Sequence, residues 1–219
     1  MIEIEKTDDG SNTLYVPELN EHYHSTKGAV TESKYIFVEQ GFNHSLKNSV
    51  SILEVGFGTG LNAILTFIEA DNKGVNTIYD TIEKYPLDKT IIEKLDYLPI
   101  IGEDNKDRFD NIHSSQWDKD IELSPFFTLH KINGDFTSYK FIRKYDVIYF
   151  DAFAPEKQPE MWTQDIFNQM YNLLNPGGVL TTYCAKGVIR RMLQAAGFKT
   201  ERLPGPPNGK REILRATKI

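Results

Sequence analysis

The stretch SILEVGFGTGLN, Ser51 to Asn62, decides the fold, because it joins a short apolar run to a turn with glycine at every second position. Ser51–Val55 has the composition of a buried strand, and Leu61 begins a helical pattern that extends to Ala70. A strand, a glycine turn and a helix in this order present backbone N–H groups and a helix N-terminus to a ligand. The stretch therefore predicts a nucleotide-binding turn.

Strands and helices alternate along most of the remaining chain. Four further runs rich in β-branched and aromatic residues predict strands at 76–83, 126–132, 145–153 and 178–184. Helical patterns cover 87–98 and 163–174, and the second ends at the helix stop NPGG. This alternation implies an α/β fold with a parallel sheet wrapped by helices, and ligands in such sheets bind at the carboxyl ends of the strands.

The two ends of the chain depart from this alternation. Residues 197–218 read as two strands joined by a Pro/Gly-rich loop, which predicts a closing antiparallel hairpin. Before Ser51, the runs NTLYV (12–16) and SKYIFVEQ (33–40) predict additional strands. We expect an N-terminal extension, residues 1–49, packed on a Rossmann-like domain of residues 50–219, with both parts in a single folding unit.

The composition is typical of a soluble globular protein, with 40% apolar and 26% charged residues among 219. The acidic N-terminus and the lack of an apolar stretch of about 18 residues argue against a secretory signal and a membrane span, so we expect a cytoplasmic protein without a membrane partner. Cys184 is the only cysteine and the five histidines show no ligand spacing. We therefore expect no metal.

Charge is distributed unevenly along the chain. The net charge is −6, yet Leu180 to Ile219 contain nine Lys and Arg against two Glu, a local charge of +7, which leaves −13 for the rest. A partner responds to the charge of one face and not to the sum. The basic C-terminal segment is compatible with a solvated surface or with a nucleic-acid site.

The spacing of the glycines distinguishes between nucleotides. A dinucleotide fingerprint requires glycine where Leu61 stands, and a phosphate-binding Walker loop requires a Lys-Ser or Lys-Thr that is missing here. Glu54, two residues before Gly56, adds a carboxylate that suits a cation better than a diphosphate. S-adenosyl-L-methionine combines adenosine with an ammonium and a sulfonium, and Glu54–Gly60 resembles the first motif of class I methyltransferases. The cofactor implied is therefore S-adenosyl-L-methionine.

Further acids follow the predicted strands. Glu83 closes the second strand, where an acid accepts the ribose hydroxyls; Asp135 follows the third, where a carboxylate accepts the adenine amino group; and Asp151 ends the fourth, beside the expected methyl. Acids at successive strand ends favour a built site over scattered surface residues. We expect these acids and their motif neighbours to bind the cofactor: Glu54, Gly56, Phe57, Gly58, Thr59, Gly60, Asn62, Glu83, Lys84, Asp135, Phe136, Asp151, Ala152 and Phe153.

Four motifs in one order resemble the methyltransferase part of the bacterial bifunctional MnmC family, which completes the 5-methylaminomethyl-2-thiouridine modification of the tRNA wobble base. They are GFGTGLN, EKYPL from Glu83, DAFAPEKQPEMWT from Asp151 and AGFKTER from Ala196. The resemblance implies a class I fold, a mostly parallel seven-stranded sheet with a C-terminal antiparallel hairpin, and methylation of a 5-aminomethyl group in the tRNA anticodon loop. The bifunctional family continues into a flavin-dependent oxidase and this chain does not, so it resembles the stand-alone form. The resemblance then implies that the amine is supplied either by a separate oxidase or by upstream modification enzymes.

In this mechanism Asp151 is the catalytic residue. Together with backbone carbonyls of 152–155 it accepts amine hydrogens and directs the lone pair at the methyl, and water or Asp151 takes the proton. Phe153 and Trp162 are expected to stack on the extruded base. The basic residues expected to bind tRNA phosphates are Lys186, Arg190, Arg191, Lys210 and Arg211.

Three other functions are compatible with the same motifs. The first is a methyltransferase of this fold that acts on a small-molecule or protein amine. The second is an aminopropyl-transferring polyamine synthase, although its decarboxylated cofactor has no need of Glu54. The third is a non-catalytic cofactor-binding partner of tRNA-modifying enzymes, against which the intact Asp151 argues.

Overall fold

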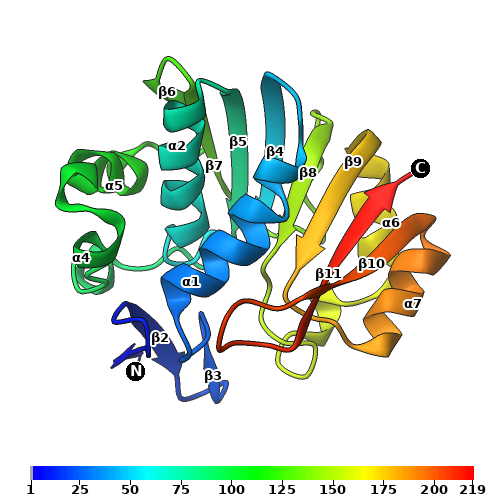
Figure 1. Ribbon diagram of the computed structural model, residues 1–219, viewed down its shortest axis with the longest axis horizontal. Coiled ribbons are helices and arrows are strands. Elements are labelled where there is room, and N and C mark those ends of the chain that lie inside the picture. The colour runs from blue at the N-terminus through cyan, green and yellow to red at the C-terminus, as the bar shows by residue number, and fades with distance from the viewer. Residues whose placement is uncertain (1) are drawn as a thin grey trace.

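The computed structural model describes residues 2–219 and contains an eight-stranded sheet with helices on both faces (Figure 1). Across the sheet the order is β10-β11-β9-β8-β4-β5-β7-β6. Five central strands, from β9 to β7, are parallel, whereas β11 is antiparallel to both of its neighbours. The strands are β4 (Ser49–Val55), β5 (Asn76–Glu83), β6 (Asp120–Ser124), β7 (Phe127–Asn133), β8 (Tyr145–Phe150), β9 (Leu174–Thr182), β10 (Phe198–Pro204) and β11 (Glu212–Lys218).

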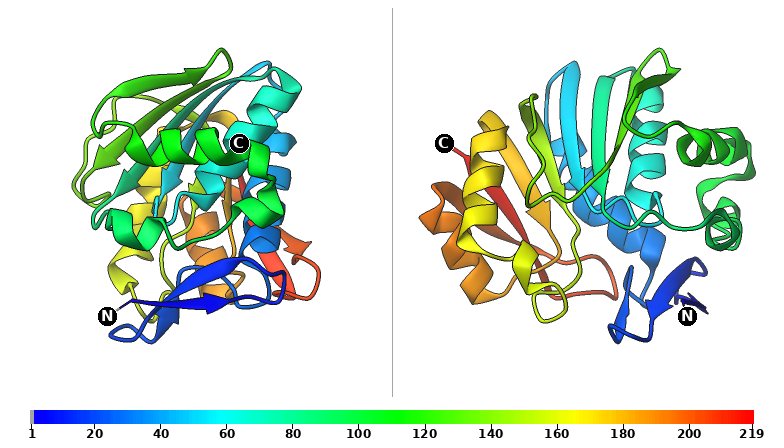
Figure 2. Two further views of the ribbon diagram at one scale, coloured as in Figure 1. Left: turned by 90° about the vertical axis from the view of Figure 1, so that its left-hand side faces the viewer. Right: turned by 180° about the vertical axis from the view of Figure 1, so that it is seen from behind.

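Helices cover the two faces in separate groups. α1 and α2 lie on the face turned to the viewer in Figure 1, and α6 lies on the opposite face, as the rear view in Figure 2 shows. The longer helices are α2 (Leu61–Lys73), α5 (Lys106–Ser114), α6 (Gln164–Leu173) and α7 (Gly187–Ala195). The short ones are α1 (Ala29–Ser33), η1 (Lys34–Glu39), η2 (Phe42–His44), α3 (Lys89–Ile92), α4 (Leu98–Ile101), η3 (Glu103–Asn105) and η4 (Pro159–Met161).

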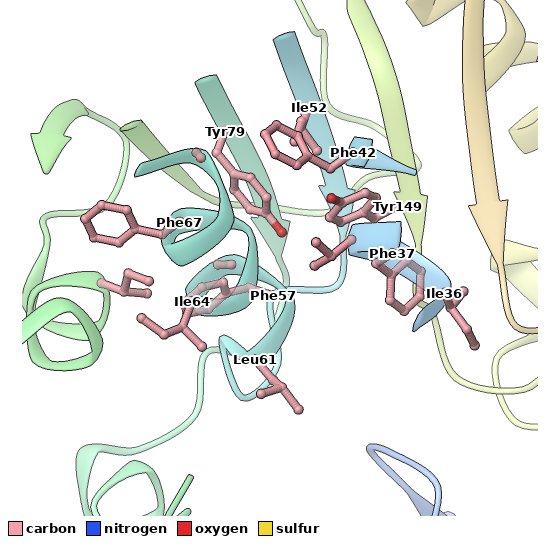
Figure 3. Packing of buried hydrophobic residues seen from close by; sticks show 14 of the residues in the cluster. Ile36, Phe37, Phe42, Ile52, Phe57, Leu61, Ile64, Phe67, Tyr79 and Tyr149 are labelled. Atoms are coloured by element: carbon pink, nitrogen blue, oxygen red, sulfur yellow. The ribbon is translucent and has the colours of Figure 1, made fainter. Parts of the chain in front are cut away.

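The core is divided by the sheet into two apolar clusters. Successive side chains of a strand point to opposite faces, so Ile52 packs with α2 in one cluster while Leu53 packs in the other. In β8, Tyr149 joins the first cluster and Phe150 the second. Figure 3 shows the first cluster between α2 and the sheet. Burial on both faces explains why these strands are almost continuously apolar.

The predicted sheet, with its parallel centre and C-terminal antiparallel hairpin, is confirmed, but it has eight strands where seven were expected. The additional strand is β6, which pairs antiparallel with β7 at the edge of the sheet. The sequence of β6, DIELS, has no buried residue. An edge strand with one paired side needs no apolar run, which is why the sequence did not indicate it.

Two predicted elements were wrong. The run SKYIFVEQ is helical, not a strand: α1 continues into η1, and its buried residues Val30, Ser33 and Phe37 recur at helical spacing. Of the helix predicted over 87–98, only α3 and the first residue of α4 are helical, and Asp96 between them has a left-handed φ of 47°. The predicted helices at 61–70 and 163–174 are confirmed as α2 and α6.

A second, three-stranded sheet lies beside the end of the large sheet where its parallel strands finish (Figure 1). It consists of β1 (Glu3–Lys6), β2 (Asn12–Val16) and β3 (Glu21–His22), so the strand predicted at 12–16 is confirmed. Leu14 of β2 packs in the same apolar cluster as Ile52. The division into residues 1–49 and 50–219 stays a prediction. Among residues 2–219, no helix combines the length and the apolar character needed to cross a membrane.

Candidate active site

A cavity of about 600 Å³ opens where β4, β5, β7 and β8 end. This is the edge of a parallel sheet at which α/β proteins bind ligands, and the volume is in the usual range for a small-molecule site. The turn after β4 forms one wall. The N-terminal segment around Tyr23 and the β10–β11 loop at Lys210 also line the cavity. Segments from both ends of the chain therefore complete a site built on the strand ends.

The glycine turn has backbone conformations that other residues rarely adopt. Gly56, Gly58 and Gly60 have φ values of 96°, 49° and 73°. A Cβ on Gly56 would lie 3.1 Å from the backbone oxygen of Asp151, and one on Gly58 would lie 3.1 Å from the Tyr23 ring. The turn thus needs glycine both for its conformation and for the close approach of its neighbours.

Glu83 is fixed by backbone donors at the end of β5. Its Oε2 accepts a hydrogen bond of 3.0 Å from Gly58 N, and its Oε1 accepts one of 2.8 Å from Tyr85 N. Each carboxylate oxygen keeps acceptor capacity toward the cavity. Glu83 is therefore positioned to accept further hydrogen bonds in the cavity.

Asp135 follows β7 and is held more tightly. Lys84 Nζ lies 2.8 Å from its Oδ2, and Thr137 donates to its Oδ1 from N at 2.9 Å and from Oγ1 at 2.7 Å. The hydrogen bond from Lys84 is the main cause that lowers the pKa of Asp135 to about 2. Asp135 is thus an ionised acceptor, and Phe136 beside it is buried in the cavity wall.

Asp151 follows β8 and lines the cavity beside the glycine turn, where its backbone oxygen lies close to Gly56. Its Oδ2 accepts a 2.8 Å hydrogen bond from Asn62 Nδ2 at the start of α2. Asn62 in turn accepts a hydrogen bond from the Ser33 hydroxyl. Burial raises the pKa of Asp151 to about 7. A carboxyl group with this pKa exchanges protons near neutral pH, which is the property required of a general base.

Comparisons with known proteins agree with this geometry. A family model described as S-adenosyl-L-methionine-dependent methyltransferase matches residues 118–219. This match covers the C-terminal part of the chain, which contains β8, β9 and the C-terminal hairpin. The predicted class I fold and cofactor are thereby confirmed.

Similar proteins bear a more specific name. The methyltransferase is 30% identical over 210 residues to the tRNA 5-methylaminomethyl-2-thiouridine biosynthesis bifunctional protein MnmC of Aeromonas salmonicida, an alignment that covers 84% of this chain and 30% of that protein. It is 30% identical to MnmC of Pseudomonas fluorescens, with 88% and 31% covered. The methyltransferase thus spans about a third of the length of these relatives.

Solved structures show the same fold. MnmC2 from Aquifex aeolicus superposes with a TM-score of 0.74 at 26% identity, covering 99% of this methyltransferase and 70% of that chain. Spermidine synthase from Thermotoga maritima superposes with a TM-score of 0.62 at 16% identity, covering 100% and 69%. The second likeness, at this identity, concerns the fold alone.

Glu54 departs from its predicted place. This side chain is completely buried and does not line the cavity. The prediction that it contacts the ammonium group of the cofactor directly is therefore wrong. Neither carboxylate oxygen has a hydrogen-bond partner among the described residues. Burial raises the pKa of Glu54 to about 8. At neutral pH it is therefore mainly a neutral acid beneath the site.

Trp162 also departs from its predicted role. It is 4% exposed and packs against Phe150 and Tyr183, so its ring cannot stack on a base without unpacking the core. Its Nε1 donates a 2.7 Å hydrogen bond to the backbone oxygen of Phe153. Phe153 itself lines the cavity, 5.1 Å from Tyr23 between ring centroids. Trp162 supports the loop that carries Phe153.

Of the remaining predicted cofactor residues, Phe57, Thr59, Lys84 and Ala152 all line the cavity. The basic residues predicted to bind tRNA do not all lie at the cavity. Lys210 lines the cavity and Arg211 beside it is exposed, whereas Lys186 is paired with Glu156. On α7, Arg191 is exposed, while Arg190 is half-buried and its Nε has no partner among the described residues.

Tyr23, His24, Glu32 and Tyr183 were not predicted as site residues, yet all four line the cavity. His24 Nε2 lies 2.9 Å from Thr59 Oγ1 of the glycine turn, and burial lowers the pKa of His24 to about 4. His24 is thus a neutral hydrogen-bonding residue. A sequence signal for these N-terminal site residues was the segment EHYHSTKGAVTES, which contains more polar and aromatic residues than a surface strand requires.

Three potential metal ligands, Asp80, Asp120 and His130, lie within 4.8 Å of one another in the described part of the chain. They do not line the large cavity. Arg143 donates to Asp80 and to Asp120 at 2.6 Å each. This cluster is therefore a salt-bridge network, in which the Arg143 guanidinium donates hydrogen bonds to both carboxylates.

Proposed function

We propose that this chain is the N-methyltransferase that converts 5-aminomethyl-(2-thio)uridine at the wobble position of tRNA into 5-methylaminomethyl-(2-thio)uridine. The observation that carries the proposal is that Asp151 and the glycine turn lie side by side in the lining of one cavity. The name of the relatives, tRNA 5-methylaminomethyl-2-thiouridine biosynthesis proteins, supports the choice of substrate.

The residues of the cavity fit S-adenosyl-L-methionine. Gly56 and Gly58 of the glycine turn line the cavity, Glu83 presents acceptors suited to ribose hydroxyls, and Asp135 presents an ionised acceptor suited to an adenine amino group. When bound, this cofactor supplies a methyl group activated by a positively charged sulfur. The remaining predicted cofactor residues complete the proposed site as wall residues, except Glu54 and Gly60, neither of which lines the cavity.

Asp151 acts on the acceptor amine in this proposal. An alkylamine has a pKa of about 10 in water and is mostly an ammonium at neutral pH, so it must lose a proton before its lone pair can attack. The pKa of Asp151, raised to about 7, lets this carboxylate accept a hydrogen bond from the amine and take up its proton. Asn62 holds the carboxylate in position for this task. Water is the alternative proton acceptor.

Aromatic and basic side chains are proposed to hold the RNA. Phe153 and Tyr23 present ring faces and edges in the cavity wall, where an unpaired wobble base can be held by stacking. Five cations of the C-terminal segment, of which Lys210 lines the cavity, are proposed to contact phosphates of the anticodon loop. They are Lys186, Arg190, Arg191, Lys210 and Arg211.

The test is methylation of natural tRNA. The protein is incubated with isotopically labelled S-adenosyl-L-methionine and tRNA from cells that lack the activity, and the nucleosides are analysed by mass spectrometry. We expect a gain of one methyl group on 5-aminomethyl-(2-thio)uridine. Label in a small molecule or a protein, with none in this nucleoside, would overturn the proposal.

Two related expectations stay predictions. The aminomethyl group is supplied either by a separate oxidase or by upstream modification enzymes. The chain acts in the cytoplasm, where its proposed tRNA substrate is found.

A further inference from the structure

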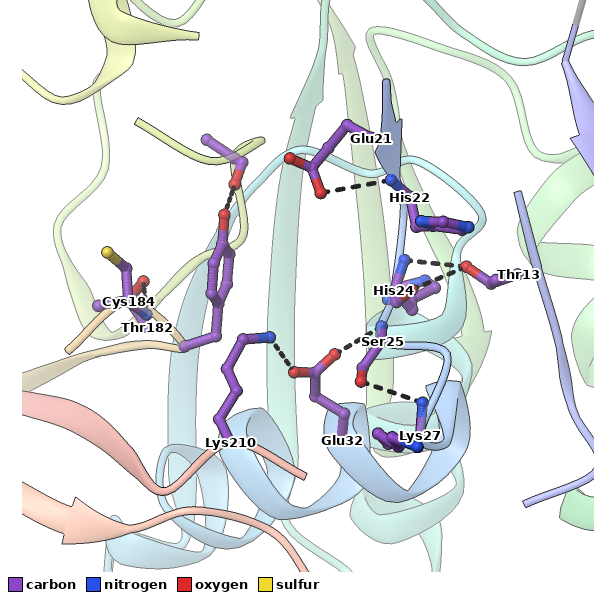
Figure 4. A network of polar contacts seen from close by, with 12 residues as sticks. Thr13, Glu21, His22, His24, Ser25, Lys27, Glu32, Thr182, Cys184 and Lys210 are labelled. Atoms are coloured by element: carbon purple, nitrogen blue, oxygen red, sulfur yellow. Dashed lines mark hydrogen bonds and ion pairs between the residues drawn. The ribbon is translucent and has the colours of Figure 1, made fainter. Parts of the chain in front are cut away.

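A cation from an exposed loop occupies a preformed subsite in the cavity. Lys210, in the β10–β11 loop, pairs its ammonium with Glu32 of α1 (Figure 4). The same ammonium lies 4.5 Å from the centroid of the Tyr183 ring. The Glu32 side chain is 9% exposed, whereas that of Lys210 is 39% exposed. A carboxylate combined with an aromatic face is an arrangement that binds an ammonium group.

The subsite keeps its shape independently of Lys210. Glu32 Oε2 accepts a 2.8 Å hydrogen bond from Ser25 N, which fixes the carboxylate. The Tyr183 hydroxyl donates a 2.8 Å hydrogen bond to the backbone oxygen of Ala152, which fixes the ring. Both anchors are backbone groups of other segments, so the carboxylate and the ring remain in place when the lysine leaves.

The same contacts join the subsite to the proposed catalytic carboxylate. Ala152, held by Tyr183, directly follows Asp151, and Ser33, which follows Glu32, donates to the Asn62 side chain that donates to Asp151. Both charges act on Asp151 as well: after burial, the main cause of its raised pKa, Glu32 raises the pKa and Lys210 lowers it. The subsite and Asp151 therefore belong to one cavity wall.

We propose that Glu32 and the Tyr183 ring form the binding subsite for the ammonium group of the methyl acceptor, and that Lys210 fills this subsite until the acceptor displaces it. This rests on the proposed function, in which the acceptor carries an aminomethyl group. Exchange of one ammonium for another keeps the buried carboxylate paired, so the expense of leaving a buried charge alone is avoided. The displaced Lys210 is then free to contact a phosphate of the same RNA.

Two ligands of the site carry a primary ammonium: the acceptor, and the amino-acid end of the cofactor. The variants Glu32→Gln and Glu160→Gln distinguish them, since Glu160 is an exposed carboxylate in the lining of the same cavity and serves as the matched control. Cofactor affinity is measured by calorimetry, and methylation of tRNA is measured by nucleoside mass spectrometry.

We expect Glu32→Gln to raise the KM for tRNA at least tenfold with the Kd for S-adenosyl-L-methionine changed less than twofold, and Glu160→Gln to change neither by more than twofold. The unchanged cofactor Kd also shows that the variant is folded. A tenfold weaker cofactor with an unchanged KM for tRNA would assign the subsite to the cofactor and overturn the proposal. If Glu32→Gln changed neither the KM for tRNA nor the Kd for S-adenosyl-L-methionine, the proposal would also be overturned.

A second variant tests whether an ammonium ligand displaces Lys210 or whether Lys210 only holds the β10–β11 loop against α1. Lys210→Met removes the internal cation, so methylammonium chloride should raise the melting temperature of this variant at concentrations at least fivefold lower than those needed with the unaltered protein. The double variant Glu32→Gln/Lys210→Met should lose this response. If Lys210 only clamps the loop to α1, methylammonium will act equally on all three proteins, which would overturn the proposal.

This measurement uses no RNA. Unaltered protein that fails to methylate tRNA would refute the proposed function, whereas protein that methylates tRNA equally well with Glu32→Gln would refute the subsite alone. The two failures are therefore distinguishable.

Discussion

At the scale of single residues, Asn62 gives Asp151 its orientation. The amide donates to Asp151 at 2.8 Å while its oxygen accepts from Ser33. Asn62 was predicted as a cofactor residue because it ends the glycine motif, and its hydrogen bond to the carboxylate adds a positioning role. The charged chemistry of the site therefore depends on a neutral residue at the start of α2.

Removal of the Asp151 carboxylate tests its role directly. Asp151→Ala should lower the single-turnover methylation rate at saturating ligands about a hundredfold or more, which is the usual scale of general base catalysis. Rapid-quench measurements with tRNA give the rate, and calorimetry checks that the cofactor still binds. An unchanged rate would remove Asp151 from the chemistry.

The pH dependence follows from the same group. Burial raises the pKa of Asp151 to about 7, so below this value the carboxyl is protonated and cannot accept the amine proton. The single-turnover rate should rise with pH through an inflection near 7. The profile of Asp151→Ala should lack this inflection, while any rise due to the amine itself persists. An inflection retained in the variant would assign it to another group.

Glu54 has a consequence for stability. Burial raises its pKa from 4.5 to about 8. Between these values the folded protein binds more protons than the unfolded chain, so this group lowers the free energy of unfolding as the pH rises through that window. An amide does not titrate, so the effect of Glu54→Gln on the free energy of unfolding should be more favourable by ~3 kcal/mol at about pH 8 than at about pH 5. Urea unfolding at both pH values measures the difference, and equal effects at both would contradict the raised pKa.

At the scale of elements, the glycine turn connects β4 to α2 in a conformation that determines the space for a ligand. Gly60 immediately precedes α2 in the left-handed region, and the backbone N–H of Gly58 donates to Glu83. The turn thus links the ends of β4 and β5. Its conformation and its hydrogen bond orient the acid that is proposed to bind the ribose.

A substitution in this turn has a matched control elsewhere. Gly56→Ala places a Cβ 3.1 Å from the Asp151 backbone oxygen at a φ of 96°, so cofactor affinity should fall at least tenfold. Gly177→Ala imposes comparable strain at a φ of 76°, but nothing lies within 4 Å of its Cβ. It should lower stability and leave affinity unchanged. Calorimetry with S-adenosyl-L-methionine measures the cofactor affinity of each variant. Equal affinity for both variants would contradict the role of the turn in cofactor binding.

At the scale of the whole molecule, both ends of the chain meet at the cavity. The N-terminal segment contributes Tyr23, His24 and Glu32, and the C-terminal hairpin contributes Lys210, 178 residues from its partner Glu32. The large sheet supplies the strand ends between them. Lys210 thereby brings one cation of the basic C-terminal segment to the cavity.

Salt dependence tests this arrangement. Affinity for tRNA should fall about tenfold or more between 50 and 200 mM salt, because bound cations replace counterions on the phosphates. Lys210→Glu/Arg211→Glu should weaken tRNA binding at least tenfold, with cofactor binding little changed. Lys199→Glu, an exposed charge on β10, is the control. Filter binding provides the affinities, and a flat salt response would contradict a phosphate-binding surface.

The sequence by itself determined the fold class, the glycine turn and the acids after β5, β7 and β8. These depend on local properties: the spacing of apolar residues, the freedom of glycine to adopt positive φ, and the common edge at which parallel strands end. The strand at 12–16 and the helices α2 and α6 were predicted on the same grounds.

Only the tertiary structure decided which polar and aromatic side chains face the cavity. Glu54 and Trp162 belong to promising motifs but are buried beneath or behind the wall, while Glu32 and Tyr183 lie in it. Long-range packing determines these positions, as it determines that 33–40 is helical. A side chain's exposure depends on neighbours that are distant in the sequence, and no local pattern contains that information.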